Sequence, residues 1–330
     1  MRISTFLPHV GVFGGVRRFL ELGNVWIGQG HDVTLFVPDG RAPDWLPYSG
    51  PVLPLAAATE RSADLALCAE THTYDAFRSH QAARHVYYCV IEKDVGLGRA
   101  AADPEVILAA NSSALRRSVA RRTGRPVLDG AGGIHLGQFH PAPERRADAP
   151  LRVLVNGRRS RTKKGTDLIL RALSRLPADV PPCEVVLFDA VEPHNRQDPR
   201  PGAPLPSRGP VQDARFVLNP SQAELVALYQ SAHVYVAAER KAGWCNTALE
   251  AIACGAALVC TPSGTRDFAR HRQTAWVVPI RHPFFLRRGI AHVLRDRAVR
   301  ERLAAAGPGA AAPWSWERLA HRLLEQLAAT

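Results

Sequence analysis

The stretch from Glu239 to Gly255 reads ERKAGWCNTALEAIACG and lies between two short apolar runs, HVYVAA before it and AALVCT after it. The segment 232–238 is rich in β-branched and aromatic residues, which predicts a buried strand. From Thr247 to Cys254 the apolar residues recur at helical spacing, and Gly255 ends that pattern, so a helix is predicted there. The polar loop between them therefore follows the carboxyl end of a strand and opens into a helix N-terminus. Ligands bind at such places in doubly wound α/β sheets, and the free N–H groups of a helix start favour a phosphate.

Glu250 follows Thr247 by three residues, which places its carboxylate one turn into the predicted helix. From there it could hold a sugar hydroxyl beside a bound phosphate. The same spacing fits a capping box, in which Thr247 and Glu250 only satisfy N–H groups at the helix end. The residues alone leave these two interpretations equally open.

This segment resembles the donor-binding signature of retaining glycosyltransferase family 4, part of the group 1 glycosyltransferases with the GT-B fold. In that signature a glutamate, a Gly-aromatic pair and a second glutamate precede a helix of the Ala-Met-Ala-Cys-Gly type. Here Gly243-Trp244 matches the pair, Glu250 the second glutamate, and 251–255 the end of the helix. The family's first glutamate falls on Ala242, and Glu239 stands three residues upstream. Either Glu239 takes that role from a longer loop or the role is vacant.

The resemblance implies an α/β protein of the GT-B type, with two Rossmann-like domains facing each other across a cleft. We expect residues 1–145 to form the acceptor-binding domain and residues 146–330 the donor-binding domain, with a C-terminal helix, 314–330, packing back on the first. The length of 330 residues and a 46% hydrophobic content suffice for two cores.

The first domain opens with a predicted strand, helix and strand at 2–8, 16–29 and 31–38. Further strands are predicted at 52–55, 64–70, 85–91 and 106–110, with helices at 74–83 and 112–122. Gly14 and Gly15 match a Gly-Gly pair that lets the family's backbone approach the donor phosphates, although glycines at such a turn are often needed only for the backbone. His72 and Glu92 follow two of the strands and are candidates for acceptor contacts, or else solvated caps of the strand ends. Glu92 stands where many relatives have a histidine.

The second domain opens with a predicted strand, 152–156, followed by the basic segment 157–165 and a helix, 166–176. Basic clusters are often merely solvated, but one between a strand end and a helix start can concentrate positive charge on an anion. The family carries Gly-Arg and then Lys-Gly here, and this Arg and Lys bind the donor diphosphate. Arg158 and Lys164 are the best matches, with Arg159 as an alternative. The loop after a strand at 214–218 flanks the nucleotide base in the family, which nominates Leu218 and Asn219.

The implied reaction moves a sugar from a nucleoside diphosphate sugar to an acceptor, with retention of the anomeric configuration. Arg158, Lys164 and the helix start would stabilise the negative charge that develops on the leaving β-phosphate. Glu250 would hold the ribose hydroxyls. The sugar and phosphate region would be lined by Glu239, Gly243, Trp244, Cys245, Asn246 and Thr247. The sequence has no Asp-x-Asp pattern of the kind that binds a metal in other glycosyltransferases, so we expect neither a metal nor another cofactor.

The net charge is +12 and the isoelectric point is near 10, which fits nucleic acid, an anionic membrane or phosphorylated small molecules as partners. No nucleic-acid-binding module is recognisable, so we expect no nucleic acid. The expected partners are a nucleotide-sugar donor and a natural-product, glycan or lipid-linked acceptor, with weak association with an anionic membrane left open. The N-terminus lacks the apolar region of a signal peptide, no run is long enough to span a membrane, and the six cysteines form no Cys-x-x-Cys pair. We therefore expect a cytoplasmic protein, and its Arg-rich and Ala-rich composition fits a GC-rich bacterial genome.

Other classes of function predict different behaviour. A GT-B-like accessory protein that has lost catalysis, suggested by Ala242, would bind nucleotide without turnover. A polyanion binder would show salt-sensitive affinity that does not depend on Glu250. A nucleotide-sugar epimerase is disfavoured because the helix motif of family 4 is well kept.

Overall fold

A computed structural model describes residues 1–92, 94–142, 150–158, 162–190 and 209–330 of the chain. The chain divides into two compact units. Unit 1 contains residues 1–133 and 314–330, and unit 2 contains residues 134–313. Within the described residues no helix is both long enough and apolar enough to cross a membrane.

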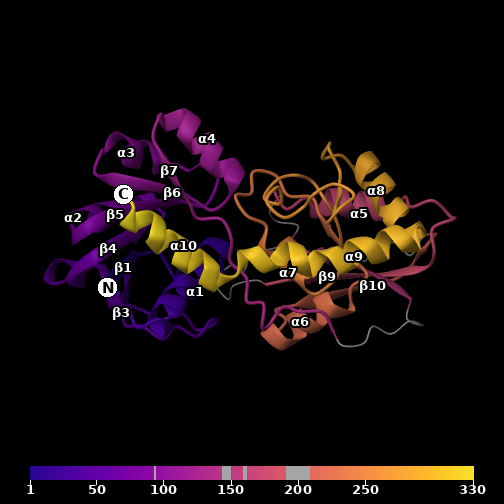
Figure 1. The fold of residues 1–330 in the computed structure, drawn as a ribbon. Coiled ribbons are helices and arrows are strands. Elements are labelled where there is room, and N and C mark those ends of the chain that lie inside the picture. The colour runs from indigo at the N-terminus through magenta and orange to yellow at the C-terminus, as the bar shows by residue number, and fades with distance from the viewer. Residues whose placement is uncertain (93, 143–149, 159–161, 191–208) are drawn as a thin grey trace. The chain divides into compact units, whose positions relative to one another are not determined.

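Unit 1 is built on a seven-stranded parallel sheet with the order β3-β2-β1-β4-β5-β6-β7 (Figure 1). Its strands are β1 (Arg2–Phe6), β2 (Asp32–Val37), β3 (Val52–Pro54), β4 (Ser62–Cys68), β5 (Gln81–Cys89), β6 (Val106–Ala110) and β7 (Val127–Asp129). Its helices are α1 (Gly14–Gly28), α2 (Tyr74–Ser79), α3 (Leu97–Ala102), α4 (Ser113–Thr123) and α10 (Trp316–Ala328), with short 3-10 turns η1 (Leu55–Glu60) and η2 (Thr71–Thr73).

Both faces of this sheet are buried, because its strands carry apolar side chains on both faces. In β5, Val86 and Tyr88 enter the core on one face, whereas Tyr87 and Cys89 enter the core on the other. Side chains of a strand point alternately to opposite faces, so a strand that is apolar throughout needs cover on both sides. Helices α1 and α10 pack together over the first of these faces, where Trp316 and Leu323 join the core.

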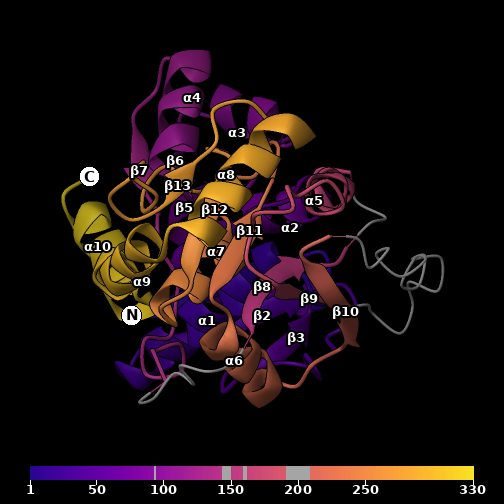
Figure 2. The same ribbon diagram turned by 90° about the vertical axis from the view of Figure 1, so that its right-hand side faces the viewer.

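Unit 2 has a six-stranded parallel sheet with the order β10-β9-β8-β11-β12-β13, which can be followed from one edge to the other in Figure 2. The strands are β8 (Leu151–Asn156), β9 (Cys183–Asp189), β10 (Val211–Leu218), β11 (Val234–Ala237), β12 (Ala257–Cys260) and β13 (Trp276–Val277). The helices are α5 (Thr166–Leu173), α6 (Gln222–Ser231), α7 (Asn246–Ala253), α8 (Pro283–Arg295) and α9 (Arg297–Ala311), followed by a 3-10 turn, η3 (Ala312–Trp314).

In each unit the chain reverses its direction of growth across the sheet at one place. In unit 1 this switch point lies between β1 and β4, and in unit 2 it lies between β8 and β11. The loops that leave two such neighbouring strands diverge to opposite faces of the sheet, which opens a crevice at the carboxyl ends of the strands. Any ligand site of either unit is expected at its switch point.

The boundary between the two units lies earlier in the chain than residue 145, where it was predicted. The ring of Phe139 packs edge-to-face on Tyr229 of α6, and the amide of Gln230 donates a hydrogen bond to the carbonyl of His140. These contacts attach residues 134–140 to unit 2, so the boundary falls at Gly133. The predicted linker, 141–150, lies mostly outside the described residues.

Some predicted elements have other limits. The helix predicted at 74–83 ends at Ser79, and β5 begins at Gln81 rather than at His85. The ring of His80 ends the helix by turning inward to the carbonyl of Ala58 at 2.8 Å. Residues 81–85 then pair with β4 although their side chains are mostly polar, because backbone pairing alone extends the strand.

Candidate active site

Lys164 and Glu239 form an ion pair at the switch point of unit 2. Lys164 lies in the loop that follows β8, and Glu239 lies two residues after β11, the neighbouring parallel strand. The ammonium Nζ lies 2.7 Å from Oε1 of Glu239, whose residue is 8% exposed. Burial is the largest single effect and would by itself lower the pKa of Lys164, but the charge of Glu239, the charge of Cys245 and the hydrogen bond to Glu239 together raise the pKa above its ordinary value. The thiol of Cys245 also donates to Oε1 of Glu239 at 3.4 Å, so the sequence prediction of Glu239 at this site has a definite place in the structure.

A sharp backbone turn presents Lys164 at this place. The next residue, Gly165, has a positive φ of 77° and forms the N-cap of α5. A Cβ atom at Gly165 would lie 2.3 Å from the carbonyl oxygen of Ala238. Only glycine fits this approach of the two loops, which explains the Lys-Gly sequence in physical terms.

Arg158 directly follows the loop glycine after β8 and is held by the end of β9. Its Nε donates to both carboxylate oxygens of Asp189, at 3.1 and 3.3 Å, and its Nη2 donates to the carbonyl of Ala190. The positive charge of Arg158 lowers the pKa of Lys164, opposing Glu239, so the two cations act on the same region. Arg159, the alternative match, lies outside the described residues.

Helix α7 begins at this edge of the sheet without a capping side chain among the described residues. Its N-cap is Cys245, whose backbone N–H donates to the carbonyl of Gly264 at 2.9 Å. Thr247 is therefore the second residue of the helix rather than its cap. The capping box proposed as the alternative for Thr247 and Glu250 does not form, because that motif needs the hydroxyl at the N-cap. Oδ1 of Asn246, at the helix start, is buried and has no hydrogen-bond partner within the described parts of the chain.

Glu250 lies one turn into α7 and is nearly inaccessible. The hydroxyl of Tyr229, on α6, donates to its Oε2 at 2.9 Å. Tyr229 is fully buried, and burial followed by the charge of Glu250 raises the pKa of the phenol well above its ordinary value. The tyrosine therefore stays a hydrogen-bond donor and fixes the carboxylate. Sequence reasoning did not single out Tyr229; its one signal is that a core tyrosine needs a polar partner.

The loop from Glu239 to Trp244 places the remaining candidates of this segment. The backbone N–H of Ala242 donates to Oγ of Ser263 at 3.0 Å, and a Cβ on Gly264 would lie 2.9 Å from that of Ala242. Gly243 follows in this tight loop. The indole of Trp244 packs edge-to-face on Phe268, with ring centroids 5.3 Å apart. The carboxylate beside Lys164 thus comes from Glu239, while Ala242 is packed against the next loop.

Leu218 and Asn219 lie at the end of β10, farther along the same edge. Leu218 is exposed, and the backbone N–H of Asn219 donates to the carbonyl of Asp189 at 2.8 Å. Since Asp189 also holds Arg158, these residues are connected to the cationic loop through the end of β9. The sequence analysis assigned no strand to 183–189, although an apolar run ended by an aspartate is a recognisable signal.

The switch point of unit 1 collects a different set of side chains. Gly14 and Gly15 are the first residues of α1, after the loop that leaves β1, and His72 lies in η2, which follows β4. Burial and the charge of Asp94 raise the pKa of Glu70, while His72 and His9 act to lower it, so these four side chains lie within electrostatic reach of one another. Asp94 in turn accepts a hydrogen bond from the hydroxyl of Tyr87 at 2.6 Å.

Two acceptor-side candidates were predicted in unit 1, and only one of them joins this group. His72 acts on Glu70, whereas Glu92 is exposed after β5 and its backbone carbonyl accepts from Arg122 at 3.3 Å. Glu70 and His9 were missed as candidates, whereas Asp94 belongs to the same polar cluster after a predicted strand as Glu92. Glu70 ends the predicted strand 64–70 and His9 directly follows the predicted strand 2–8, and these positions at strand ends are the signal that would have found them.

The sequence profile of the family described as glycosyl transferases group 1 matches residues 139–309, just over half of the chain. The chain belongs to this family. The match covers the segments that carry Lys164, Glu239 and Glu250. As a group 1 glycosyltransferase, the protein is an enzyme that transfers sugar from a nucleoside diphosphate sugar. None of the curated proteins matches the sequence closely enough to count as a relative.

Solved structures share the whole fold of this glycosyltransferase. Sucrose-phosphate synthase from Thermosynechococcus elongatus has 18% identity and a TM-score of 0.75, with 99% of both chains covered. HepE of Anabaena, in complex with UDP-glucose, has 14% identity and a TM-score of 0.77 over 100% of both chains. A glycosyltransferase from Rickettsia africae has 13% identity and a TM-score of 0.73, covering 98% of this chain and 97% of its own. The prediction of a GT-B fold with two Rossmann-like domains is confirmed.

Proposed function

We propose that this glycosyltransferase transfers the sugar with retention of the anomeric configuration, without a metal ion, to a natural-product, glycan or lipid-linked acceptor. The observation that carries the proposal is the pair of cations, Arg158 and Lys164, in one loop at the switch point of unit 2, next to the start of α7. The leaving nucleoside diphosphate gains negative charge as its bond to the sugar breaks. Preorganised cations and helix N–H groups stabilise that charge as it forms, which is the task a metal performs in other enzymes.

Each cation is held by a carboxylate of the protein. Lys164 pairs with Glu239 and Arg158 pairs with Asp189, so both side chains keep their positions before any ligand arrives. A diphosphate would then bind to the remaining donor groups of these cations and to the start of α7, whose first turn, Asn-Thr-Ala, carries no opposing carboxylate. The buried Oδ1 of Asn246 marks a polar atom at this start that a ligand hydroxyl could satisfy.

Glu239 and Glu250 have separate parts in this proposal. Glu239, beside Lys164, would accept hydrogen bonds from hydroxyls of the donor sugar. Glu250, held by Tyr229, would accept from the ribose hydroxyls of the nucleotide. The wall of the site would be formed by Trp244, Gly243, Cys245 and Thr247, with Leu218 and Asn219 beside the base.

The acceptor would bind at the switch point of unit 1. Glu70 and His72, with Asp94 and His9, offer hydrogen-bonding and charged groups at that edge, and Glu92 is a further candidate. A cytoplasmic location is part of the proposal, since all six cysteines are buried free thiols, as in proteins of reducing compartments.

Titration calorimetry in the presence of a chelator tests the donor site. UDP is tried first, because HepE was solved with UDP-glucose, and GDP, TDP and ADP follow. One nucleotide should bind at micromolar strength, about 8 kcal/mol. Lys164→Ala and Glu250→Ala should each weaken it by tenfold or more, and the exposed neighbour Lys163→Ala, which removes the same charge, should not. If no nucleotide binds, or if all three variants bind alike, the assignment of the donor site is wrong.

Tyr229→Phe tests the support of Glu250. It removes only the hydroxyl that donates to Oε2, so nucleotide affinity should fall by about 10- to 150-fold, the value of one hydrogen bond to a charged group, about 1.5–3 kcal/mol. The loss should be absent when Tyr229→Phe is made in the Glu250→Ala background. An equal loss in both backgrounds would show that Tyr229 acts on the site by another route. The anomeric configuration of the product, read by NMR, tests retention.

A further inference from the structure

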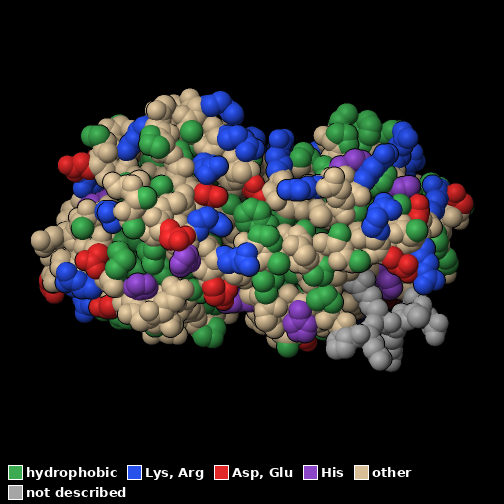
Figure 3. Space-filling view, viewed as in Figure 1, with side chains coloured by type: hydrophobic (Ala, Val, Ile, Leu, Met, Phe, Trp, Pro, Cys, Tyr) green, Lys and Arg blue, Asp and Glu red, His purple; other side chains and the backbone are tan. Residues whose placement is uncertain are grey.

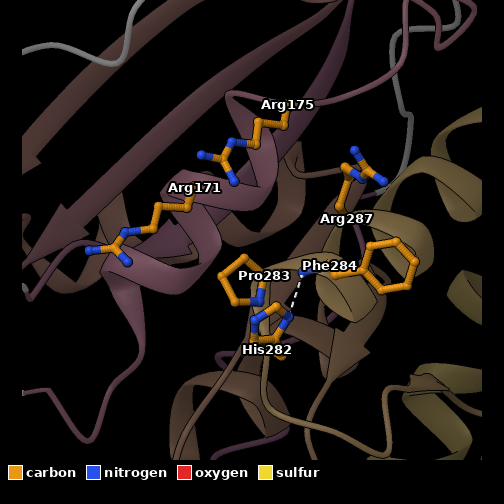
Figure 4. Close-up of a pocket in the computed structure, with 6 residues that line it drawn as sticks. All are labelled: Arg171, Arg175, His282, Pro283, Phe284 and Arg287. Carbon is orange, nitrogen blue, oxygen red and sulfur yellow. Dashed lines mark hydrogen bonds between the residues drawn. The ribbon is translucent and has the colours of Figure 1, made fainter.

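Helices α5 and α8 pack against each other in unit 2 and border a cavity of about 350 Å³ that the proposed reaction does not use. The cavity is lined by Arg171 and Arg175 of α5, by His282 and Pro283 at the start of α8, and by Phe284 and Arg287 in its first turns (Figure 4). With the neighbouring Arg288 and Ile280, these residues form a surface that we call the α5–α8 face.

The arginines of this face form no ion pairs within the described residues. Arg171, Arg175, Arg287 and Arg288 have no carboxylate partner within the described part of the chain, whereas Arg295, on the same helix α8, pairs with Asp179. The guanidinium groups of Arg287 and Arg288 lie 5.4 and 5.8 Å from the ring centroid of Phe284. Figure 3 shows blue Lys and Arg side chains gathered over α8, beside green hydrophobic ones. The face therefore combines uncompensated positive charge with an exposed aromatic ring.

Two large apolar side chains project from this cationic surface. Phe284 is 44% exposed and Ile280 is 53% exposed, and the chain between them is only three residues long. Exposing such side chains to water is unfavourable, and an aromatic ring flanked by arginines is the composition of segments that insert at a membrane interface.

The geometry does not suit a single small anion. Pro283, the first residue of α8, has no N–H group, and the N–H of Phe284 is already bonded to Nδ1 of His282 at 3.2 Å. The guanidinium groups of Arg171, Arg175 and Arg287 are spread across the view in Figure 4 rather than directed at one point. Spread cations match many phosphates arranged on a surface.

We propose that the α5–α8 face docks unit 2 on an anionic lipid bilayer. The arginines bind lipid phosphates, and Phe284 and Ile280 insert between the headgroups. A nucleic acid would also match the charge, but the aliphatic Ile280 has no base-stacking role, whereas both apolar side chains gain from the lipid interface. Arg281, between them in sequence, donates to the carbonyls of Ala238 and Thr162, at 2.6 and 2.7 Å, so the docking face continues into the loops around Lys164.

The test is flotation of the full chain with vesicles, and it requires no activity, so its result is independent of the proposed reaction. Vesicles of phosphatidylcholine alone are compared with vesicles that contain about 30% phosphatidylglycerol, whose negative surface attracts basic residues. The chain should float only with the anionic vesicles. Arg287→Gln with Arg288→Gln should lower binding roughly 10- to 30-fold, from about one kcal/mol for each basic residue near the surface. Arg302→Gln with Arg318→Gln, two exposed arginines elsewhere, removes the same charge and should change binding by less than threefold.

Phe284→Ala separates insertion from charge. It should reduce binding to anionic vesicles several-fold while leaving the salt dependence as in the unsubstituted chain, and circular dichroism checks that the variant folds. Equal losses in the two arginine pairs, or no flotation of the unsubstituted chain, would overturn the proposal. The proposal would also be overturned if the chain did not bind vesicles but bound a DNA duplex in a way that depends on Arg287 and Arg288.

Discussion

Replacement of Glu239 by glutamine tests how the Lys164 ammonium is held and what it binds. The two side chains are 2.7 Å apart, and Glu239 is almost fully buried while the Lys164 side chain is 25% exposed. Glutamine keeps the shape and one acceptor oxygen, so the change replaces a hydrogen bond between two charged groups by one from the Lys164 ammonium to a neutral amide oxygen. Such bonds differ by about 1–1.5 kcal/mol, and the free energy of unfolding should fall by about that amount.

Glu239→Gln should change ligand affinity in the opposite direction for a free nucleotide. The carboxylate that repels and competes with a diphosphate is removed, while the Lys164 charge stays. At an effective dielectric constant of about 20, removing one charge at about 8–10 Å is worth about 1.7–2.1 kcal/mol. UDP, if it is the nucleotide bound, should therefore bind about 15- to 35-fold more tightly. UDP-glucose should gain less, because its sugar loses an acceptor.

Urea unfolding and calorimetry measure the two effects, with Glu184→Gln as the matched control. Glu184 pairs with Arg152 between β9 and β8, with both side chains partly buried, as in the Lys164 pair. That variant should lose similar stability and leave nucleotide affinity unchanged. Weaker or unchanged UDP binding by Glu239→Gln would refute the reasoning that Lys164 receives the diphosphate beside this carboxylate.

Two other predictions concern stability. Gly165→Ala places a Cβ 2.3 Å from a backbone oxygen at a residue with positive φ, so it should lower the free energy of unfolding in urea by more than about 2 kcal/mol. The control is Gly98→Ala, in α3 with open space around it, which should be neutral or stabilising. Similar losses of stability in both variants would contradict the argument from the contact between the loops. Burial lowers the pKa of His80 below 6.5, so the folded state resists the proton that the unfolded chain accepts, and stability should fall as the pH drops below 6.5, by at most about 1.4 kcal/mol per pH unit for this group. His80→Asn keeps a donor for the carbonyl of Ala58 and should reduce the loss of stability at low pH, whereas the exposed control His321→Gln should leave that loss unchanged. An equal pH dependence of stability in the two variants would show that the buried imidazole is not its cause.

The sequence predicted elements better than the contacts between them. The strand before the central loop and the helix after it were predicted at 232–238 and 247–254, and they lie at 234–237 and 246–253. Periodicity reports which side chains an element buries, and that information is local. The partners of the site residues are not local: Asp189 holds Arg158 from 31 residues away, and Tyr229 holds Glu250 from 21. Those pairs depend on strand order, which periodicity does not contain.

Other differences have similarly physical origins. The capping box was inferred from the spacing of Thr247 and Glu250, but the helix starts earlier, at a loop fixed by the backbone bond from Cys245 to Gly264. The boundary between the units was placed in a Pro-rich segment by composition, whereas it is decided by where Phe139 packs. No helices were assigned to 283–311, which α8 and α9 occupy. The sites of unit 1 were the least predictable, because short polar segments after strands do not reveal which of their side chains converge.

Helix α10 has a consequence for how the protein is made. It completes the core of unit 1 with Trp316, Leu319 and Leu323, its Ala320 carbonyl accepts from the indole of Trp26, and a side chain on Gly133 would collide with the Trp316 ring at 2.3 Å. Unit 1 is thus assembled from the two ends of the chain, and unit 2 from one uninterrupted segment between them. During synthesis the ribosome releases all of unit 2 before it releases α10. Of the two units, unit 1 therefore begins to emerge before unit 2 but completes its core after it, and a chain stopped before α10 leaves unit 1, rather than unit 2, unfinished.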